Sequence, residues 1–164
     1  MIVFSGTTPI NYLILANKIF VLPKLLGKVV IPSAVFRELQ ADKTPKAVKE
    51  FIENLPEWLE VKQSLVLFDE DLDELGAGER EAIGLAEELN ADVLLMDERS
   101  GREAALKRNL PVVGTLGILE RAAEKDLIDF SETLQELKAN GFFISSALEK
   151  DFLERDVKRK QAKN

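Results

Sequence analysis

The 164-residue chain contains neither cysteine nor histidine. Without cysteine there is no disulfide and no thiolate-bound metal, and nothing in the composition indicates an oxidising compartment. Without histidine there is no imidazole general base, no Ser-His-Asp triad and no imidazole-bound metal. Any catalysis must therefore depend on carboxylate, hydroxyl, Lys or Arg side chains. Any metal site must be built from oxygen ligands, which suit Mg²⁺ or Mn²⁺ better than Zn²⁺.

Long apolar runs and an excess of positive charge are also absent. No stretch approaches the roughly 18 consecutive apolar residues of a membrane-spanning helix. Pro9, Pro23 and nearby polar residues interrupt the early apolar runs, so we expect no signal peptide, no membrane partner and a cytoplasmic protein. A net charge of −7 argues against a globally basic nucleic-acid binder but leaves room for a local basic patch.

The hydrophobic content of 46% suits a full core, and the length suits one domain over residues 1–164. Short apolar runs at 2–4, 29–31, 93–96 and 111–113 are typical of buried parallel strands, whereas 58–62 fits either a strand or a connector. Helical patterns separate these runs, with a turn expected at residues 5–9 and a solvated acidic segment at 69–74. Residues from about 131 to 164 form a helical extension whose end, from Lys158, should fray. Strands that alternate with helices predict an α/β fold with a central, mainly parallel sheet.

The stretch from Gly76 to Ala105 carries two acids at the junctions of its expected elements. Glu79 falls in the first turn of a helix and continues the inward stripe of Ala82 and Ile83, whereas Glu81 and Glu88 fall elsewhere on the helical wheel. Asp97 is the first polar residue after the buried strand at 93–96. In open α/β sheets the ligand crevice lies outside the carboxyl ends of the strands, so both acids could face it.

Glu38 and, as an accessory, Glu98 complete the set of candidate acids. Clustered carboxylates commonly hold one or two hard cations, which activate water and neutralise charge on a phosphodiester. Each acid also has a purely structural interpretation. The helix dipole alone favours Glu79, an Asp in the place of Asp97 often forms a turn or an N-cap, and the pattern does not define the inward face of the helix that begins at Ser33, its expected N-cap, and carries Glu38.

Positive side chains follow Asp97 closely. Arg99 and Arg102, with Lys107 and Arg108, could contact the phosphates of a nucleic acid. A solvated helix face explains the same residues without any ligand. With one Trp and one Tyr, base stacking is not indicated.

Four segments in order resemble the PIN-domain family of metal-dependent nucleases, particularly the prokaryotic branch related to VapC-type toxins. They are IVFSGTTPINYLILA, VVIPSAVFREL, GAGEREAIGLAEELNADVLLMDERSGREAA and LKANGFFISSALEKDFL. The resemblance implies a three-layer α/β/α sandwich with an acidic pocket that binds Mg²⁺ or Mn²⁺ and cleaves single-stranded RNA. Its metal ligands would be Glu38, Glu79 and Asp97, with Glu98 as an accessory candidate. It also implies a homodimer restrained by an antitoxin protein. Ser5, Thr7, Arg99 and Arg102 are the candidate substrate-binding residues.

The chain departs from the family pattern at Gly6, where the first family acid would fall. Glycine offers no ligand, and the neighbouring hydroxyls of Ser5 and Thr7 lack a carboxylate's charge. We therefore expect impaired nuclease activity, or alternatively a PIN-fold protein that binds its partners without cleavage. A third interpretation, a flavodoxin-like or phosphatase-like domain, lacks a Gly-rich phosphate loop after the first strand and leaves Glu38 and Glu79 without a role.

Overall fold

In the computed structural model, which describes residues 1–65 and 70–164, short strands alternate with helices along the chain. The strands are β1 (Val3–Ser5), β2 (Val29–Pro32), β3 (Leu59–Lys62), β4 (Val93–Leu95) and β5 (Val112–Val113). The helices are α1 (Thr7–Leu15), α2 (Val21–Leu26), α3 (Ser33–Glu38), α4 (Lys46–Glu53), α5 (Ala77–Glu88), α6 (Arg99–Lys107), α7 (Thr115–Glu124), α8 (Phe130–Ala139) and α9 (Ser146–Ala162), with a 3₁₀ turn, η1 (Glu70–Leu72).

The strands form one parallel sheet in the order β3-β2-β1-β4-β5. The predicted central parallel sheet is thus confirmed, and the ambiguous segment at 58–62 supplies its edge strand, β3. From β1 the chain adds strands first on one side and then on the other. The order therefore reverses between β1 and β4, and a crevice at such a reversal is where open α/β sheets bind their ligands.

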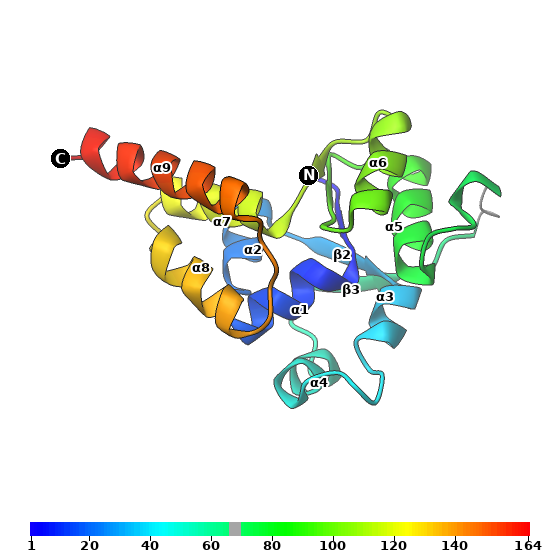
Figure 1. Ribbon diagram of the computed structural model, residues 1–164. Coiled ribbons are helices and arrows are strands. Elements are labelled where there is room, and N and C mark those ends of the chain that lie inside the picture. Colours follow the sequence, from blue (N-terminus) through cyan, green and yellow to red (C-terminus); the bar gives the residue numbers. More distant parts are fainter. Residues whose placement is uncertain (66–69) are drawn as a thin grey trace.

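Successive residues of the central strands point into two separate cores, as the pleat of a strand requires. Val3 and Leu95 belong to a core shared with α1, α2, α7 and α8, whereas Phe4 and Leu94 belong to one shared with α5 and α6. Figure 1 shows α5 and α6 on one side of the sheet and α1, α7 and α8 on the other. The α/β/α layering is that of the predicted sandwich.

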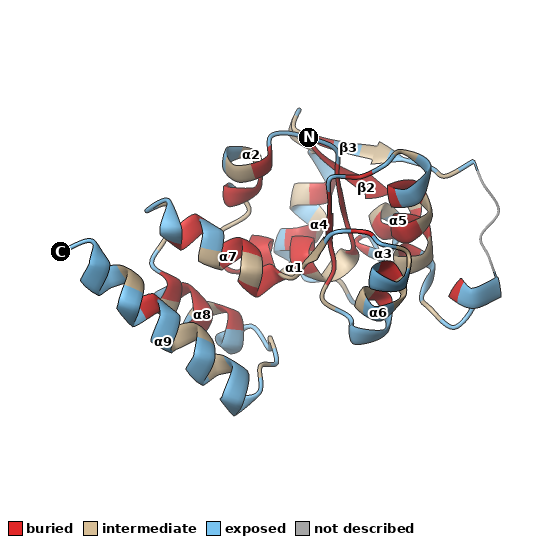
Figure 2. Cartoon of the chain, turned by 90° about the horizontal axis from the view of Figure 1, so that it is seen from above, coloured by how far each residue is buried: buried red, intermediate tan, exposed pale blue. Residues whose placement is uncertain are grey.

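The C-terminal helices pack on the layer that contains α1 and α7. Phe130 of α8 is buried in the core, and its ring stacks on Phe152 of α9 with centroids 5.6 Å apart. Arg155 and Arg159 of α9 donate to Glu120 of α7 at 2.8 and 3.0 Å. Most of α9 is otherwise exposed (Figure 2). None of the described helices is long and apolar enough to cross a membrane.

Three local predictions need correction. Helix α1 begins at Thr7, so the expected turn at residues 5–9 is already helical from its third residue. Ser33 is the first residue of α3 rather than its N-cap, which is Pro32. The expected frayed end does not begin at Lys158, because α9 stays helical to Ala162. The predicted acidic segment at 69–74 begins at Asp69, outside the described residues, and continues as η1, whose Leu72 is buried.

Candidate active site

The candidate acids meet in one cavity at the carboxyl ends of β1 and β4. Its volume is about 270 Å³. It is lined by Gly6, Thr7, Thr8, Pro9, Glu38, Gly76, Glu79, Met96, Asp97 and Glu98. We call it the acid pocket. Three separate segments, α3, the start of α5 and the loop after β4, bring their carboxylates to it, although they are far apart in the chain.

Glu38 reaches the acid pocket from the last residue of α3. Its carboxylate accepts hydrogen bonds from the backbone N–H of Gly78, at 2.9 Å, and from the hydroxyl of Thr7. A Cβ on Gly78 would lie 2.8 Å from one of the Glu38 oxygens. Glycine at position 78 is therefore what lets this carboxylate lie against the first turn of α5. The Thr7 hydroxyl, a candidate for substrate contact, is engaged with Glu38.

Glu79 lies in the first turn of α5 and accepts a long hydrogen bond of 3.4 Å from the N–H of Gly76. Burial raises the pKa of Glu79, and the charges of Glu98 and Glu38 raise it further, while the bond from Gly76 opposes both. Burial is the main cause of the rise, and the smaller contributions of Glu98 and Glu38 to the pKa are the repulsion between carboxylates of the acid pocket. A bound cation would relieve that repulsion.

Asp97 follows β4 and is mostly buried. One of its oxygens accepts from the N–H of Thr115 at 2.8 Å, and the other accepts from the Thr115 hydroxyl at 2.5 Å. Burial raises the pKa of Asp97, and Glu98 adds to the rise, whereas the two bonds from Thr115 and the charge of Arg102 oppose it. Asp97 does cap a helix, but not the one that the sequence indicated. It accepts from the first residue of α7, whereas the helix that follows it directly is α6.

The remaining candidates lie at the edges of the acid pocket. Glu98 lines it and accepts a 3.4 Å hydrogen bond from the hydroxyl of Thr8. Ser5 is fully buried, and its hydroxyl donates to the carbonyl of Gly6 at 3.0 Å, so it is the least accessible of the candidate substrate contacts. Thr8 also lines the acid pocket and is more exposed than Ser5.

The two candidate arginines line an adjoining groove of about 860 Å³, which shares Thr8, Asp97 and Glu98 with the acid pocket. Arg99 is almost fully exposed and pairs with Glu103 at 3.0 Å, one turn along α6. Arg102 turns inward and donates to the carbonyl of Met96 at 3.3 Å. Arg102 is thus the cation that acts on Asp97, whereas Arg99 faces solvent in the groove.

Gly6 occupies a backbone conformation that any residue can adopt, with φ −76° and ψ −177°. A Cβ there would lie 3.6 Å from the carbonyl of Leu95 and 3.9 Å from the methyl carbon of Met96, both ordinary contacts. Neither the backbone nor the packing requires glycine at this position. Because Gly6 is also the N-cap of α1, that helix begins without a side-chain cap.

The acid pocket suits a divalent ion by the chemistry of its polar groups more than by the spacing of its acids. The polar lining of the acid pocket consists of carboxylates, hydroxyls and backbone groups, and such oxygen donors suit Mg²⁺ and Mn²⁺. Within residues 1–65 and 70–164, however, no three acidic side chains lie close enough together to form a metal-binding group. The donor set therefore matches the kind of ion but is incomplete, and Gly6 is the lining position from which a further carboxylate could reach it.

Two residues of this region escaped the sequence analysis. Thr115 holds both oxygens of Asp97, and a threonine directly after a glycine at the start of a helix is a signal that could have found it. Glu81 was placed away from the inward stripe of α5, yet it is buried. Nothing local in the sequence marks it, because its partners come from other segments.

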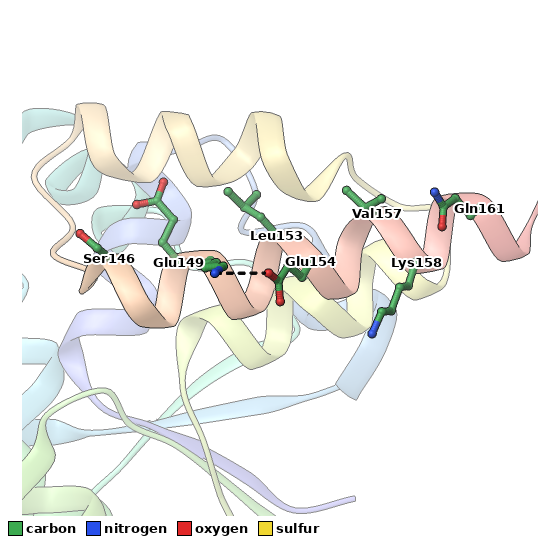
Figure 3. A pocket seen from close by; sticks show the side chains of 8 residues that line it. Ser146, Glu149, Leu153, Glu154, Val157, Lys158 and Gln161 are labelled. Atoms are coloured by element: carbon green, nitrogen blue, oxygen red, sulfur yellow. Dashed lines mark ion pairs between the residues drawn. The ribbon is translucent and has the colours of Figure 1, made fainter.

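A second large groove, of about 780 Å³, runs along the outer face of α9 and is lined by residues of that helix alone (Figure 3). Its two acids are engaged in ion pairs with lysines. Glu154 pairs with Lys150 at 3.9 Å, and Glu149 pairs with Lys138 at 2.9 Å. This groove therefore does not offer the clustered acids that the acid pocket has.

Comparison with known proteins adds one family. A protein-family model described as DUF3368, PIN domain, matches residues 1–157, a span that includes every strand of the sheet and every residue of the acid pocket. No curated protein matches the chain.

Proposed function

Because this chain belongs to the PIN-domain family, whose fold is of the nuclease type, we propose that it is a metal-dependent ribonuclease. In this proposal the acid pocket is the active site, and Gly6 lowers the activity. The observation that carries the proposal is the convergence of four carboxylates from three separate segments on one pocket at the strand-order reversal. Because the chain has no histidine, a catalytic metal ion would have to be held by such oxygen ligands.

In this proposal Glu38, Glu79 and Asp97 hold the ion, with Glu98 as an accessory. A bound Mg²⁺ or Mn²⁺ supplies an activated water and neutralises charge that builds on the phosphodiester. Thr115 holds Asp97 in place through both of its oxygens.

The adjoining groove accounts for the substrate in the same proposal. It opens from the acid pocket and carries the guanidinium groups of Arg99 and Arg102, which suit the phosphates of single-stranded RNA. The proposed biological role is that of the toxin of a toxin–antitoxin pair in the cytoplasm, as a homodimer restrained by an antitoxin protein. The family resemblance is what supports this role.

Gly6 lowers the expected activity because it removes one anionic ligand. Losses at metal ligands and at groups that stabilise developing charge cost on the order of 10²-fold in rate. The second candidate function follows from the same position. With no three acids close together among the described residues, and with Glu38 and Asp97 engaged by protein donors, the chain would bind its partners through the PIN fold without cleaving RNA.

Cleavage of a mixed, fluorescently labelled single-stranded RNA in Mn²⁺ separates the two candidates. The variants are the natural chain, Gly6→Asp, the uncharged and nearly isosteric control Gly6→Asn, and Gly6→Asp combined with Asp97→Asn. The ribonuclease proposal expects cleavage by Gly6→Asp to exceed that of the natural chain and of Gly6→Asn by about 10²-fold. It also expects cleavage to disappear when Asp97→Asn is added. If no variant cleaves, the binding function is the better account.

A further inference from the structure

Glu81 is a buried carboxylate that does not line the acid pocket. Its side chain lies on α5, is only 5% exposed, and is the one buried glutamate among the described residues. It accepts from the N–H of Ala34 at 2.8 Å, from the hydroxyl of Ser33 at 2.9 and 3.2 Å, and from the N–H of Ser64 at 3.1 Å. Three donors from two other segments thus converge on one carboxylate.

Each of the helices α3 and α5 supplies a carboxylate that accepts a hydrogen bond from the start of the other helix. Glu38 of α3 accepts from the N–H of Gly78, the second residue of α5, and Glu81 of α5 accepts from the N–H of Ala34, the second residue of α3. The first N–H groups of a helix have no partner within it, and the positive end of the helix dipole favours an anion there. Each helix therefore supplies a carboxylate to the first turn of the other, and α3 has no acidic residue of its own in that turn.

The position of Glu38 depends on these reciprocal hydrogen bonds because α3 has only six residues. A helix of that length is not stable by itself and depends on tertiary contacts, which here are the burial of Ala34 and Val35 and the hydrogen bonds at its two ends. Glu81 holds the first end through Ser33 and Ala34, and Glu38 is the last residue at the other end, beside the acid pocket.

We propose that Glu81 is a positioning residue for Glu38. By holding the start of α3 against α5, it sets where the carboxylate of Glu38 lies in the acid pocket. The consequence for metal binding and cleavage rests on the proposed function, whereas the structural coupling between the two glutamates does not.

The conservative change Glu81→Gln tests the coupling. It keeps the shape of the side chain but replaces one acceptor oxygen by an NH₂ donor. Because the N–H groups of Ala34 and Ser64 bond different oxygens of Glu81, one of these two N–H donors then faces another donor. Ser33→Ala approaches the same contact from α3 and protects the test against a folding failure of the first variant. The matched control is Glu87→Gln, which alters a glutamate of the same helix that pairs with Arg108 at the surface.

The first readout is the backbone amide of Gly78, followed by NMR and hydrogen exchange without metal. This N–H is bonded by Glu38 and not by Glu81, so it reports the position of Glu38. Exchange should become roughly tenfold faster in Glu81→Gln and in Ser33→Ala, as expected for the loss of one hydrogen bond. The amide of Arg80, which bonds within the same helical turn, should keep its protection. An unchanged Gly78 amide in a folded Glu81→Gln protein overturns the proposal.

The second readout is Mn²⁺ affinity, measured by the paramagnetic resonance of the free ion in the Gly6→Asp background. Loss of an outer residue that positions a metal ligand commonly weakens binding by about 10- to 100-fold. We expect that loss for Glu81→Gln and none for Glu87→Gln. If the Gly78 amide responds and Mn²⁺ affinity does not, the coupling holds and Glu38 is not a metal ligand, so the failure belongs to the proposed function.

Discussion

Gly6→Asp should make the stability of this protein depend on divalent ions. The new side chain would enter the acid pocket without a clash, since the nearest atoms to its Cβ lie at 3.6 and 3.9 Å. The backbone at position 6 already has φ −76°, which suits aspartate. The natural chain should respond only weakly to the same ions, because its close acidic ligands are incomplete.

The magnitude without metal is a balance of small terms. Removing the freedom of a glycine whose conformation suits other residues stabilises by about 0.4–1 kcal/mol, and a capping side chain at the start of α1 adds a few tenths. A new negative charge opposes this gain. For an assumed separation of about 8 Å from one like charge, the repulsion costs roughly 2 kcal/mol at an effective dielectric constant of about 20. Gly6→Asn gains the first two terms without the third. In a chelator Gly6→Asp should therefore be less stable than Gly6→Asn by about 2 kcal/mol.

Adding Mn²⁺ should reverse that order. An ion at a concentration about 100 times its dissociation constant stabilises the folded state by about 2.7 kcal/mol. For a chain of this size that corresponds to a rise of roughly 5–11 °C in Tm. Differential scanning calorimetry of Gly6→Asp, Gly6→Asn and the natural chain, in chelator and in Mn²⁺, measures all the terms. Equal Tm values for the two variants in chelator, with no response of either to Mn²⁺, would refute the placement of position 6 at a metal site.

Three further predictions concern other contacts. Gly78→Ala should destabilise by about 1–3 kcal/mol in urea unfolding, because its Cβ would lie 2.8 Å from the carboxylate at the end of α3, whereas Gly76→Ala, with nothing within 4 Å, should be neutral. Thr115→Val should raise the pKa of Asp97 further, since the hydroxyl bond that it removes lowers that pKa; carboxyl NMR titration would contradict this if the pKa fell or stayed. The pKa of Asp129 lies below its usual 3.8, chiefly through the N–H of the first helical turn, so its contribution to stability is present above that value and is lost as the pH falls through the folded-state pKa. Urea unfolding should therefore show Asp129→Asn less stable than the natural chain at pH near 7, and the gap should close in acid; a gap independent of pH would contradict it.

The fold was largely accessible from the sequence because its signals are local. The uninterrupted apolar run at 93–96 predicted a strand covered on both faces, and β4 is a buried inner strand between β1 and β5. The edge strand β3 could not be identified in the same way. Only Leu59 of its four residues is buried, so the segment lacks the continuous apolar character of the inner strands.

Glu79 and Asp97 were found by their places at the ends of elements, since a strand end and a helix start are visible in the pattern of apolar residues, whereas Glu38 was singled out by the family resemblance. Helix ends were predicted less well. Local composition places the polar residues after Lys158 in a frayed tail, but Lys163 bonds Asp126 at 2.6 Å from beyond the end of α9. That contact is between segments 37 residues apart and leaves no local trace.

What the sequence by itself determined is the element order, the parallel sheet, the PIN resemblance and the list of candidate acids. What only the tertiary structure decided is the partner of each acid. Asp97 accepts from Thr115, Glu38 of α3 accepts from the start of α5, and Glu81 of α5 accepts from the start of α3. The physical reason is that a buried carboxylate needs donors. Those donors are the free N–H groups of helix starts, and the strand order decides which helix starts become neighbours.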